Sequence, residues 1–236
     1  MRLDKYISKS AGLSRSQARR TIRRGMVTVA GVVRREPAWQ VAGDEEVACR
    51  DEILAPARKR YFMLHKPVGV VCATVDRRHP TVIDLLELPN PAGLHIAGRL
   101  DIDATGLVLV TDDGAWSHRV TSPRHHCRKT YHVCVAEPLE GGLKERFARG
   151  LMLRNEKRRT RPAELEILGP REARVTVGEG RYHQVKRMFA ACNNRVTALH
   201  REAIGPIGLD EALEPGESRP LREDEVMAIL SGPEVS

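Results

Sequence analysis

The sequence predicts an α+β protein with a small basic domain at the N-terminus and a larger domain built on a mixed, largely antiparallel β-sheet. Two observations lead to this fold class. Residues 1–36 contain ten Lys or Arg and only two acidic residues, whereas the remaining 200 residues hold equal numbers of both. From Tyr61 onward, short β-rich runs are interleaved with helical patterns without strict β-α-β alternation, which favours a largely antiparallel sheet. With 236 residues, 41% of them hydrophobic, the chain is long enough for one small and one medium domain.

The first 50 residues predict two short helices and a small sheet. Apolar residues recur at helical spacing from Leu3 to Ala11, and Ser14 is placed to cap a second helix that ends at Gly25. MVTVAGVVRR then predicts a hairpin around an Ala-Gly turn, and DEEVACR predicts a further strand. The polar stretch RDEILAPARKR predicts a linker. The expected boundaries are therefore 1–50 for the first domain, 51–60 for the linker and 61–236 for the second domain.

The second domain has strand-like and helix-like runs in mixed order. Strands are expected at YFMLHKPVGVVCAT, LHIAG, GLVLVT, KTYHVCV, AELEIL and ARVTV. Helices are expected at TVIDLLEL, LEGGLKERFARG, HQVKRMFAAC and REDEVMAILSG. The four-residue step from Tyr182 to Lys186 would put both on one face of the third helix. Asp112-Asp113-Gly114 follows a strand and predicts a turn.

The concentrated positive charge of the N-terminal module indicates nucleic-acid binding, because clustered cations release counterions when they meet phosphates. A membrane-surface helix would need bulky apolar residues opposite the charges, and residues 14–24 offer chiefly Ala18 and Ile22. The expected nucleic-acid contacts of the second helix are Arg15, Arg19, Arg20, Arg23 and Arg24.

The chain is expected to be cytoplasmic and free of membrane contact. No apolar run approaches the roughly 18 residues needed to span a bilayer, and charges occupy the N-terminus where a secretory signal would be apolar. The five cysteines are scattered and contain no CxxC pair, so we expect reduced thiols.

Three segments concentrate polar side chains. AGRLDIDATGLVLVTDDG presents Arg99, Asp101 and Asp103 in a loop between apolar strands, where catalytic residues are commonly found. KTYHV places Lys129 and Tyr131 in a strand. The third segment, EGRYHQVKRMF, places four polar residues at a loop-to-helix junction: Arg181, His183, Lys186 and Arg187.

These segments together resemble a known family. RLDKYIS…GLSRSQARRTIRRGMVTVAG, in residues 1–48, resembles the S4-type RNA-binding domain. The ordered set GRLD, KTY and GRYHQVKRMF resembles three motifs of pseudouridine synthases, and with the N-terminal module it resembles their RsuA-type family. The match continues through HKPVGVVCAT, TDDGAWSHRVTSPRHHCRKTY and LHREAIGPIGL, and so covers nearly the whole chain. One departure is Ala104, where the family commonly has a hydroxyl residue three positions after the catalytic aspartate.

The resemblance implies a role for each candidate residue. Asp101 would be the catalytic carboxylate, Lys186 the cation that keeps it ionised and oriented, and Tyr131 the ring against the target base. Whether Asp101 attacks the sugar, attacks the uracil ring or assists a glycal route stays open. Arg99 would fill the space left by an extruded uridine or contact a phosphate. RNA contacts are expected from Lys129, Arg181 and Arg187. The isomerisation involves no redox change and no phosphate energy, so no cofactor and no metal are expected.

The implied substrate is one uridine of small-subunit ribosomal RNA, uridine 516 of 16S rRNA. The partner would be 16S rRNA or a partly assembled small subunit, and the enzyme would act as a monomer. Two alternatives are a large-subunit rRNA pseudouridine synthase and an RNA-binding assembly factor without catalysis.

Two hypotheses that involve a metal ion are less well supported by the sequence. A metal-dependent phosphodiesterase would need four aspartates, two of which belong to the predicted turn: Asp101, Asp103, Asp112 and Asp113. A zinc site could draw on His118, His125, His126 and Cys127, but neighbouring arginines would repel the cation. RNEKRRTRP, residues 154–162, is either a solvated loop or a second RNA contact.

Overall fold

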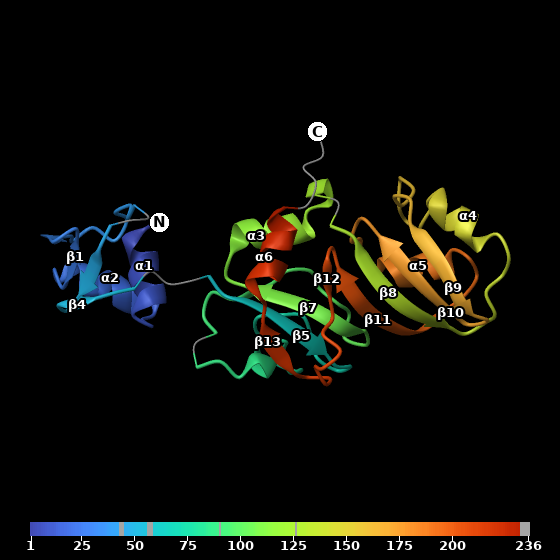
Figure 1. The fold of residues 1–236 in the computed structure, drawn as a ribbon, viewed down its shortest axis with the longest axis horizontal. Coiled ribbons are helices and arrows are strands. Elements are labelled where there is room, and N and C mark those ends of the chain that lie inside the picture. Colours follow the sequence, from blue (N-terminus) through green and yellow to red (C-terminus); the bar gives the residue numbers. More distant parts are fainter. Residues whose placement is uncertain (43–44, 56–58, 90, 126, 232–236) are drawn as a thin grey trace. The chain divides into compact units, whose positions relative to one another are not determined.

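The computed structural model describes residues 1–42, 45–55, 59–89, 91–125 and 127–231 (Figure 1). The chain forms two compact units, Met1–Lys59 and Arg60–Ser236. Among the described residues, no helix is both long enough and apolar enough to cross a membrane.

The N-terminal unit contains the two expected helices, α1 (Leu3–Ser10) and α2 (Arg15–Arg23). Ser14 begins α2 through a reciprocal capping box: the backbone N–H of Gln17 donates to Ser14 Oγ (3.2 Å), and Ser14 N–H donates to Gln17 Oε1 (2.8 Å). The helices pack on a four-stranded sheet of order β2-β1-β3-β4, formed by Val32–Val33, Val27–Val29, Val47–Cys49 and Glu52–Ile53. Because β4 pairs with β3, the first residues of the stretch that we expected to be a linker belong to this sheet.

The C-terminal unit is built on a nine-stranded sheet. Its main path runs β13-β5-β7-β11-β8-β10-β9, with β6 paired to β7 and β12 paired to β11. Only the β7–β11 pair among these is parallel, so the sheet is mixed and largely antiparallel, as expected. In chain order the strands are β5 (Tyr61–Lys66), β6 (His95–Ile96), β7 (Thr105–Thr111), β8 (Lys129–Val135), β9 (Glu164–Gly169), β10 (Glu172–Val177), β11 (Val196–Ile204), β12 (Ile207–Gly208) and β13 (Ser218–Pro220).

Helices cover this sheet at both ends (Figure 1). They are α3 (Gly114–Thr121), α4 (Leu143–Ala148), α5 (Gln184–Ala190) and α6 (Glu223–Leu230), with 3-10 turns η1 (Asp84–Leu86) and η2 (Pro123–His125). The turn predicted at Asp112-Asp113-Gly114 is instead the start of α3, where Asp113 accepts hydrogen bonds from the N–H groups of Ala115 (3.1 Å) and Trp116 (3.4 Å). The helix expected at TVIDLLEL is reduced to the 3-10 turn.

The central strand β7 is buried on both faces. Leu107 and Leu109 pack into one hydrophobic cluster with Trp116, whereas Val108 and Val110 pack into another on the opposite face. Side chains alternate between the faces of a strand, so these two clusters lie on either side of the sheet. The loop that enters β7 therefore starts from a strand fixed on both faces.

Candidate active site

Asp101 lies in the loop between β6 and β7, where its carboxylate meets side chains from the start of α5. Lys186 Nζ is 3.0 Å from Asp101 Oδ2, and His183 Nε2 is 3.4 Å from Asp101 Oδ1. The side chain of Asp101 is 25% exposed, so a ligand can reach the carboxylate. The structure thus joins Asp101 and Lys186, which are 85 positions apart in the chain.

Lys186 is shared with a second carboxylate. Its ammonium donates to Asp103 Oδ1 at 2.6 Å. Burial would lower the pKa of Lys186, but its hydrogen bonds to Asp103 and Asp101 outweigh that effect and raise the pKa. The same hydrogen bond lowers the pKa of Asp103, which burial alone would raise. Lys186 is therefore an ammonium ion at neutral pH, and Asp103 competes with Asp101 for it.

Arg201, on β11, forms hydrogen bonds to the backbone at both ends of the Asp101 loop. Its guanidinium donates to the backbone carbonyls of Gly98 (2.9 Å), Arg99 (3.2 Å) and Leu107 (2.8 Å). The residue is only 1% exposed, so these bonds satisfy a buried charge. The motif comparison did not single out Arg201, because its partners become visible only in the fold.

A second buried cation, Lys66, holds the middle of the loop. Its ammonium donates to the carbonyls of Ala104 (2.7 Å) and Ile102 (3.3 Å), and burial lowers its pKa. The N–H of Leu100 donates to the sulfur of the buried Cys72 at 3.2 Å. Ala104, which stands where the family commonly has a hydroxyl residue, takes part in this network through its backbone carbonyl, which accepts from Lys66.

Tyr131 is aligned with this loop through the register of three neighbouring strands. It faces Arg201 across the β8–β11 pair, and Arg201 faces Gly106 across the β11–β7 pair. The guanidinium carbon of Arg201 lies 6.0 Å from the centre of the Tyr131 ring. Gly106 has φ +103°, and a Cβ there would collide with the Arg201 backbone. Only glycine therefore lets β7 approach β11 this closely.

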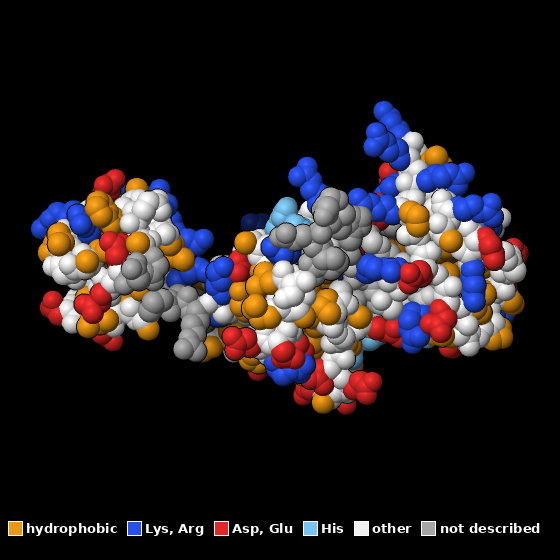
Figure 2. All heavy atoms as spheres, turned by 45° about the horizontal axis from the view of Figure 1, so that its top comes forward, with side chains coloured by type: hydrophobic (Ala, Val, Ile, Leu, Met, Phe, Trp, Pro, Cys, Tyr) orange, Lys and Arg blue, Asp and Glu red, His pale blue; other side chains and the backbone are white. Residues whose placement is uncertain are grey.

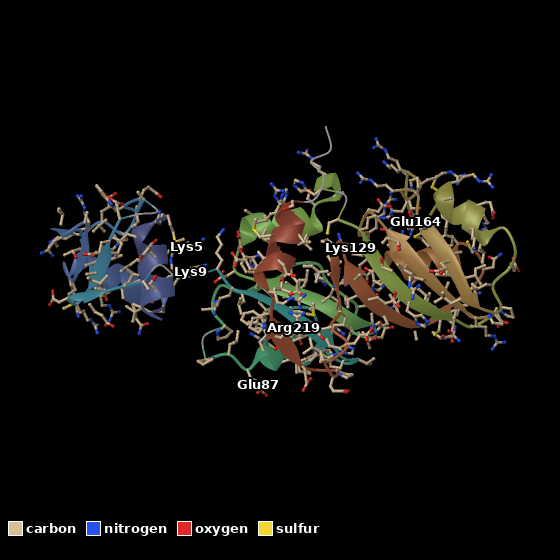
Figure 3. The ribbon with its side chains drawn as sticks, in the orientation of Figure 1. Lys5, Lys9, Glu87, Lys129, Glu164 and Arg219 are labelled. Carbon is tan, nitrogen blue, oxygen red and sulfur yellow. The ribbon has the colours of Figure 1, made fainter. Side chains whose placement is uncertain are left out.

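The expected RNA-binding residues of the C-terminal unit differ in their exposure and in their hydrogen-bond partners. Arg99 is exposed beside Asp101. Lys129, labelled in Figure 3 at the start of β8, is 8% exposed and donates to the carbonyls of Val120 and Cys127. Lys129 therefore ties β8 to the end of α3, a position with little surface for RNA. Arg181 and Arg187 donate to backbone carbonyls of residues 154–159.

The arginines of α2 also fall into two groups. Arg15 and Arg19, with Arg2, surround the fully buried Asp4 at 2.9, 3.0 and 3.1 Å. Burial alone would raise the pKa of Asp4, but hydrogen bonds from Arg2 and Arg19 and the charge of Arg15 lower it to about 2. The second group is exposed and forms no ion pair within the part of the chain that the structure describes: Arg20, Arg23 and Arg24.

The described residues contain no group of three or more His, Cys, Asp or Glu side chains placed to hold a metal ion. The rings of His118 and His125 meet edge to face at 5.7 Å, and His126 lies outside the described residues. Asp112 pairs with Arg60 at 3.1 Å and Asp113 caps α3. Two of the four carboxylates of the phosphodiesterase hypothesis are thus engaged in an ion pair and a helix cap.

Comparisons with known proteins match both units. A family model described as RNA pseudouridylate synthase matches residues 60–191, and an S4 domain model matches residues 1–47. The chain is 54% identical over 231 residues to Ribosomal small subunit pseudouridine synthase A of Escherichia coli (strain K12), covering 98% of this chain and 100% of the relative. The Haemophilus influenzae protein of the same name is 50% identical, with 98% and 100% covered. A solved pseudouridylate synthase structure matches with a TM-score of 0.71 at 49% identity, covering 97% of this chain and 99% of the other.

Proposed function

Because the chain belongs to the RNA pseudouridylate synthase family, we propose that it converts one uridine of small-subunit ribosomal RNA, uridine 516 of 16S rRNA, to pseudouridine. The observation on which the catalytic assignment rests is the Asp101–Lys186 ion pair at 3.0 Å. This assignment is supported by the Asp101 loop, whose backbone carbonyls accept hydrogen bonds from two buried cations, Arg201 and Lys66. The names of the relatives support a substrate in the small subunit.

The reaction breaks the bond between N1 of uracil and C1′ of ribose and joins C1′ to C5, with C5 losing a proton and N1 gaining one. Asp101 supplies the carboxylate, either as nucleophile toward the sugar or the ring, or as the base of a glycal route. Lys186 keeps this carboxylate ionised when a bound base excludes water, since burial would otherwise favour its neutral form. The flat face and polar tip of Tyr131 suit a contact with the target uracil.

RNA binding is divided between the two domains in this proposal. The S4 domain binds phosphates through α2, with Arg20, Arg23 and Arg24 fully available and Arg15 and Arg19 also oriented by Asp4. Arg99 is exposed beside Asp101 and enters the space that the extruded uridine leaves. Asp101, Tyr131 and Lys186 come from one chain, so a monomer acting on 16S rRNA or an assembling subunit in the cytoplasm suffices.

The decisive experiment is Asp101→Asn, assayed by tritium release from a 16S transcript labelled at C5 of uridine. The amide keeps the size of the carboxylate but cannot act as an anionic nucleophile or base, so tritium release should vanish while RNA affinity changes little. Asp224→Asn, at an exposed carboxylate of α6, is the matched control and should behave as wild type. Full activity of Asp101→Asn would remove Asp101 from the catalytic role.

The substrate is tested by carbodiimide treatment and reverse transcription of rRNA from cells with and without the gene. A stop that disappears at uridine 516 of 16S rRNA supports the assignment. A stop that disappears in large-subunit rRNA instead would leave the reaction intact and overturn the target. If no stop disappears and the purified protein releases no tritium, the assembly-factor alternative is correct.

A further inference from the structure

An exposed aromatic stack lies beside the Asp101 carboxylate and has no part in the chemistry described above. Tyr182 is 76% exposed, and its ring stacks on that of His183 with centres 3.8 Å apart and planes at 20°. His183 in turn contacts Asp101 at 3.4 Å. Because His183 covers one face of the tyrosine ring and most of the residue is exposed, the other face is open to solvent.

The stack is held in a fixed geometry. His183 has φ +47° and ψ 37°, a left-handed conformation that costs a non-glycine residue on the order of 1–3 kcal/mol. The Arg187 side chain donates to the Tyr182 carbonyl at 3.1 Å, and its backbone N–H donates to the His183 carbonyl at 3.0 Å. We expected Tyr182 on the helix face of Lys186, but α5 begins only at Gln184, and Tyr182 instead stands before the helix.

A loop rich in Lys and Arg, residues 154–162, accepts hydrogen bonds from the same segment, and we call it the basic loop. Arg187 donates to the Arg154 carbonyl (2.7 Å) and to Glu156 (3.1 Å). Arg181 donates to the carbonyls of Arg158 (2.9 Å) and Arg159 (2.7 Å). The two arginines that we expected to touch RNA thus use several of their donors to dock this loop beside Tyr182.

The loop presents its own side chains to solvent. Arg154, Lys157 and Arg158 are exposed, and no ion pair involves them in the described residues. The nearby carboxylate of Glu156 is engaged by Arg181 and Arg187. In Figure 2, Lys and Arg side chains project from the region of the C-terminal unit around α4 and β9, between which this loop runs. We call Arg154, Lys157 and Arg158 the loop cations.

We propose that Tyr182 and the loop cations form a second nucleotide subsite, in which the open face of Tyr182 stacks on a base adjacent to the target uridine. The loop cations bind the phosphates of that flanking strand. The inference rests on the proposed function, since Asp101 marks where the target uridine sits. Extruding a uridine leaves its neighbours without a stacking partner, and an aromatic face one ring away from the catalytic carboxylate can replace it. Stacking does not depend on base identity, so the subsite positions the strand and does not read its sequence.

The test measures affinity in the Asp101→Asn background with 16S fragments in which single nucleotides near the target are made abasic. With Tyr182 intact, an abasic residue at one flanking position should weaken binding by on the order of tenfold. Tyr182→Ala should weaken binding of the intact RNA by a similar factor, and the abasic substitution should then cause no further loss. Tyr182→Phe keeps the ring and should bind as the parent does.

Two outcomes would overturn the subsite. One is equal affinity of the Tyr182→Ala and parent proteins for intact RNA. The other is a loss that maps to the target uridine itself, because Tyr182 would then hold the target base. Since binding is measured without catalysis, these results do not depend on the role of Asp101, which is tested separately by tritium release.

The loop cations have their own readout. Replacing Lys157 and Arg158 by Gln should flatten the dependence of log affinity on log salt by about 1.4, since each phosphate contact to a single strand contributes about 0.7. Arg222→Gln, at the exposed N-cap residue of α6, is the control and should leave the slope unchanged. An unchanged slope in the Lys157/Arg158 variant would remove the loop from the subsite.

Discussion

Arg201→Met tests whether the buried guanidinium positions the catalytic loop. The methionine fills much of the same volume but leaves the carbonyls of Gly98, Arg99 and Leu107 without their donor. Each unsatisfied buried carbonyl costs about 1–3 kcal/mol, less where water can enter. Since Gly98 and Arg99 lie near the surface, we expect a total loss of about 3–5 kcal/mol, the range typical of breaking a buried ionic contact.

The catalytic effect should exceed what lost stability explains. A loop that relaxes by about 1 Å moves Asp101 out of line, and misplacement of that size can lower a rate about 100-fold. We therefore expect folded Arg201→Met to bind RNA normally and to release tritium about 100-fold more slowly in single turnover. Arg201→Lys keeps the charge but cannot reach all three carbonyls, and should recover part of the rate.

Stability and catalysis can be separated in this chain. It contains two tryptophans, Trp39 in the N-terminal unit and Trp116 in the C-terminal unit. Urea unfolding followed by Trp116 fluorescence in a Trp39→Phe background reports on the catalytic domain alone. Arg219→Met removes a cation bound to Glu225 and Asp210 at the β13 and α6 side of the fold (Figure 3), and should destabilise without slowing catalysis. A normal single-turnover rate in folded Arg201→Met would refute the positioning role.

Three further predictions follow from the site and the S4 domain. Lys186→Met should slow tritium release by about 100-fold, and since hydrogen bonds to Asp103 and Asp101 hold the pKa of Lys186 above its ordinary range, the wild-type rate should show no loss from its titration near neutral pH. Tyr131→Phe should retain most activity if the ring only contacts the base, whereas Tyr131→Ala should lose about 1–3 kcal/mol of stacking; near-normal rates for both would remove Tyr131 from the site. Asp4 has its pKa lowered to about 2, so its ion pairs stabilise the S4 domain above about pH 4, and that stabilisation disappears as the pH falls toward 2. The excess stability of wild type over Asp4→Asn, from Trp39 fluorescence, should shrink over the same range, and a constant difference would contradict the assignment.

Local signals in the sequence were sufficient for the elements that depend on neighbouring residues. Ser14 is predicted as the N-cap of α2, and the β-rich runs GLVLVT and KTYHVCV predict β7 and β8. The α+β fold class with an N-terminal S4 domain is confirmed. At Asp113 the same kind of evidence misled, because an aspartate that bonds to N–H groups two and three residues ahead is equally suited to a turn and to a helix start.

The structural role of Arg201 could not be read from the sequence because it depends on a contact 103 residues away. In LHREAIG the polar residues interrupt the apolar pattern, so β11 was not expected, although it is the central strand between β7 and β8. An arginine in such a position is stable only if carbonyls satisfy its donors, and those carbonyls belong to the Asp101 loop. The polar residue therefore marks a tertiary contact and not an exposed strand.

The GRYHQVKR segment shows why residue type alone did not separate catalysis from RNA binding. Its side chains point in two directions: His183 and Lys186 reach Asp101, whereas Arg181 and Arg187 reach the backbone of the basic loop. An arginine presents five donors that suit phosphates and carbonyls equally. Loss of activity after substituting Arg187 would therefore arise from displacement of both Tyr182 and the basic loop, even if the guanidinium never meets a phosphate. A salt slope that flattens by more than the about 0.7 of one lost contact would distinguish that indirect effect, in which the loop cations also leave their phosphates, from the loss of a single direct phosphate contact.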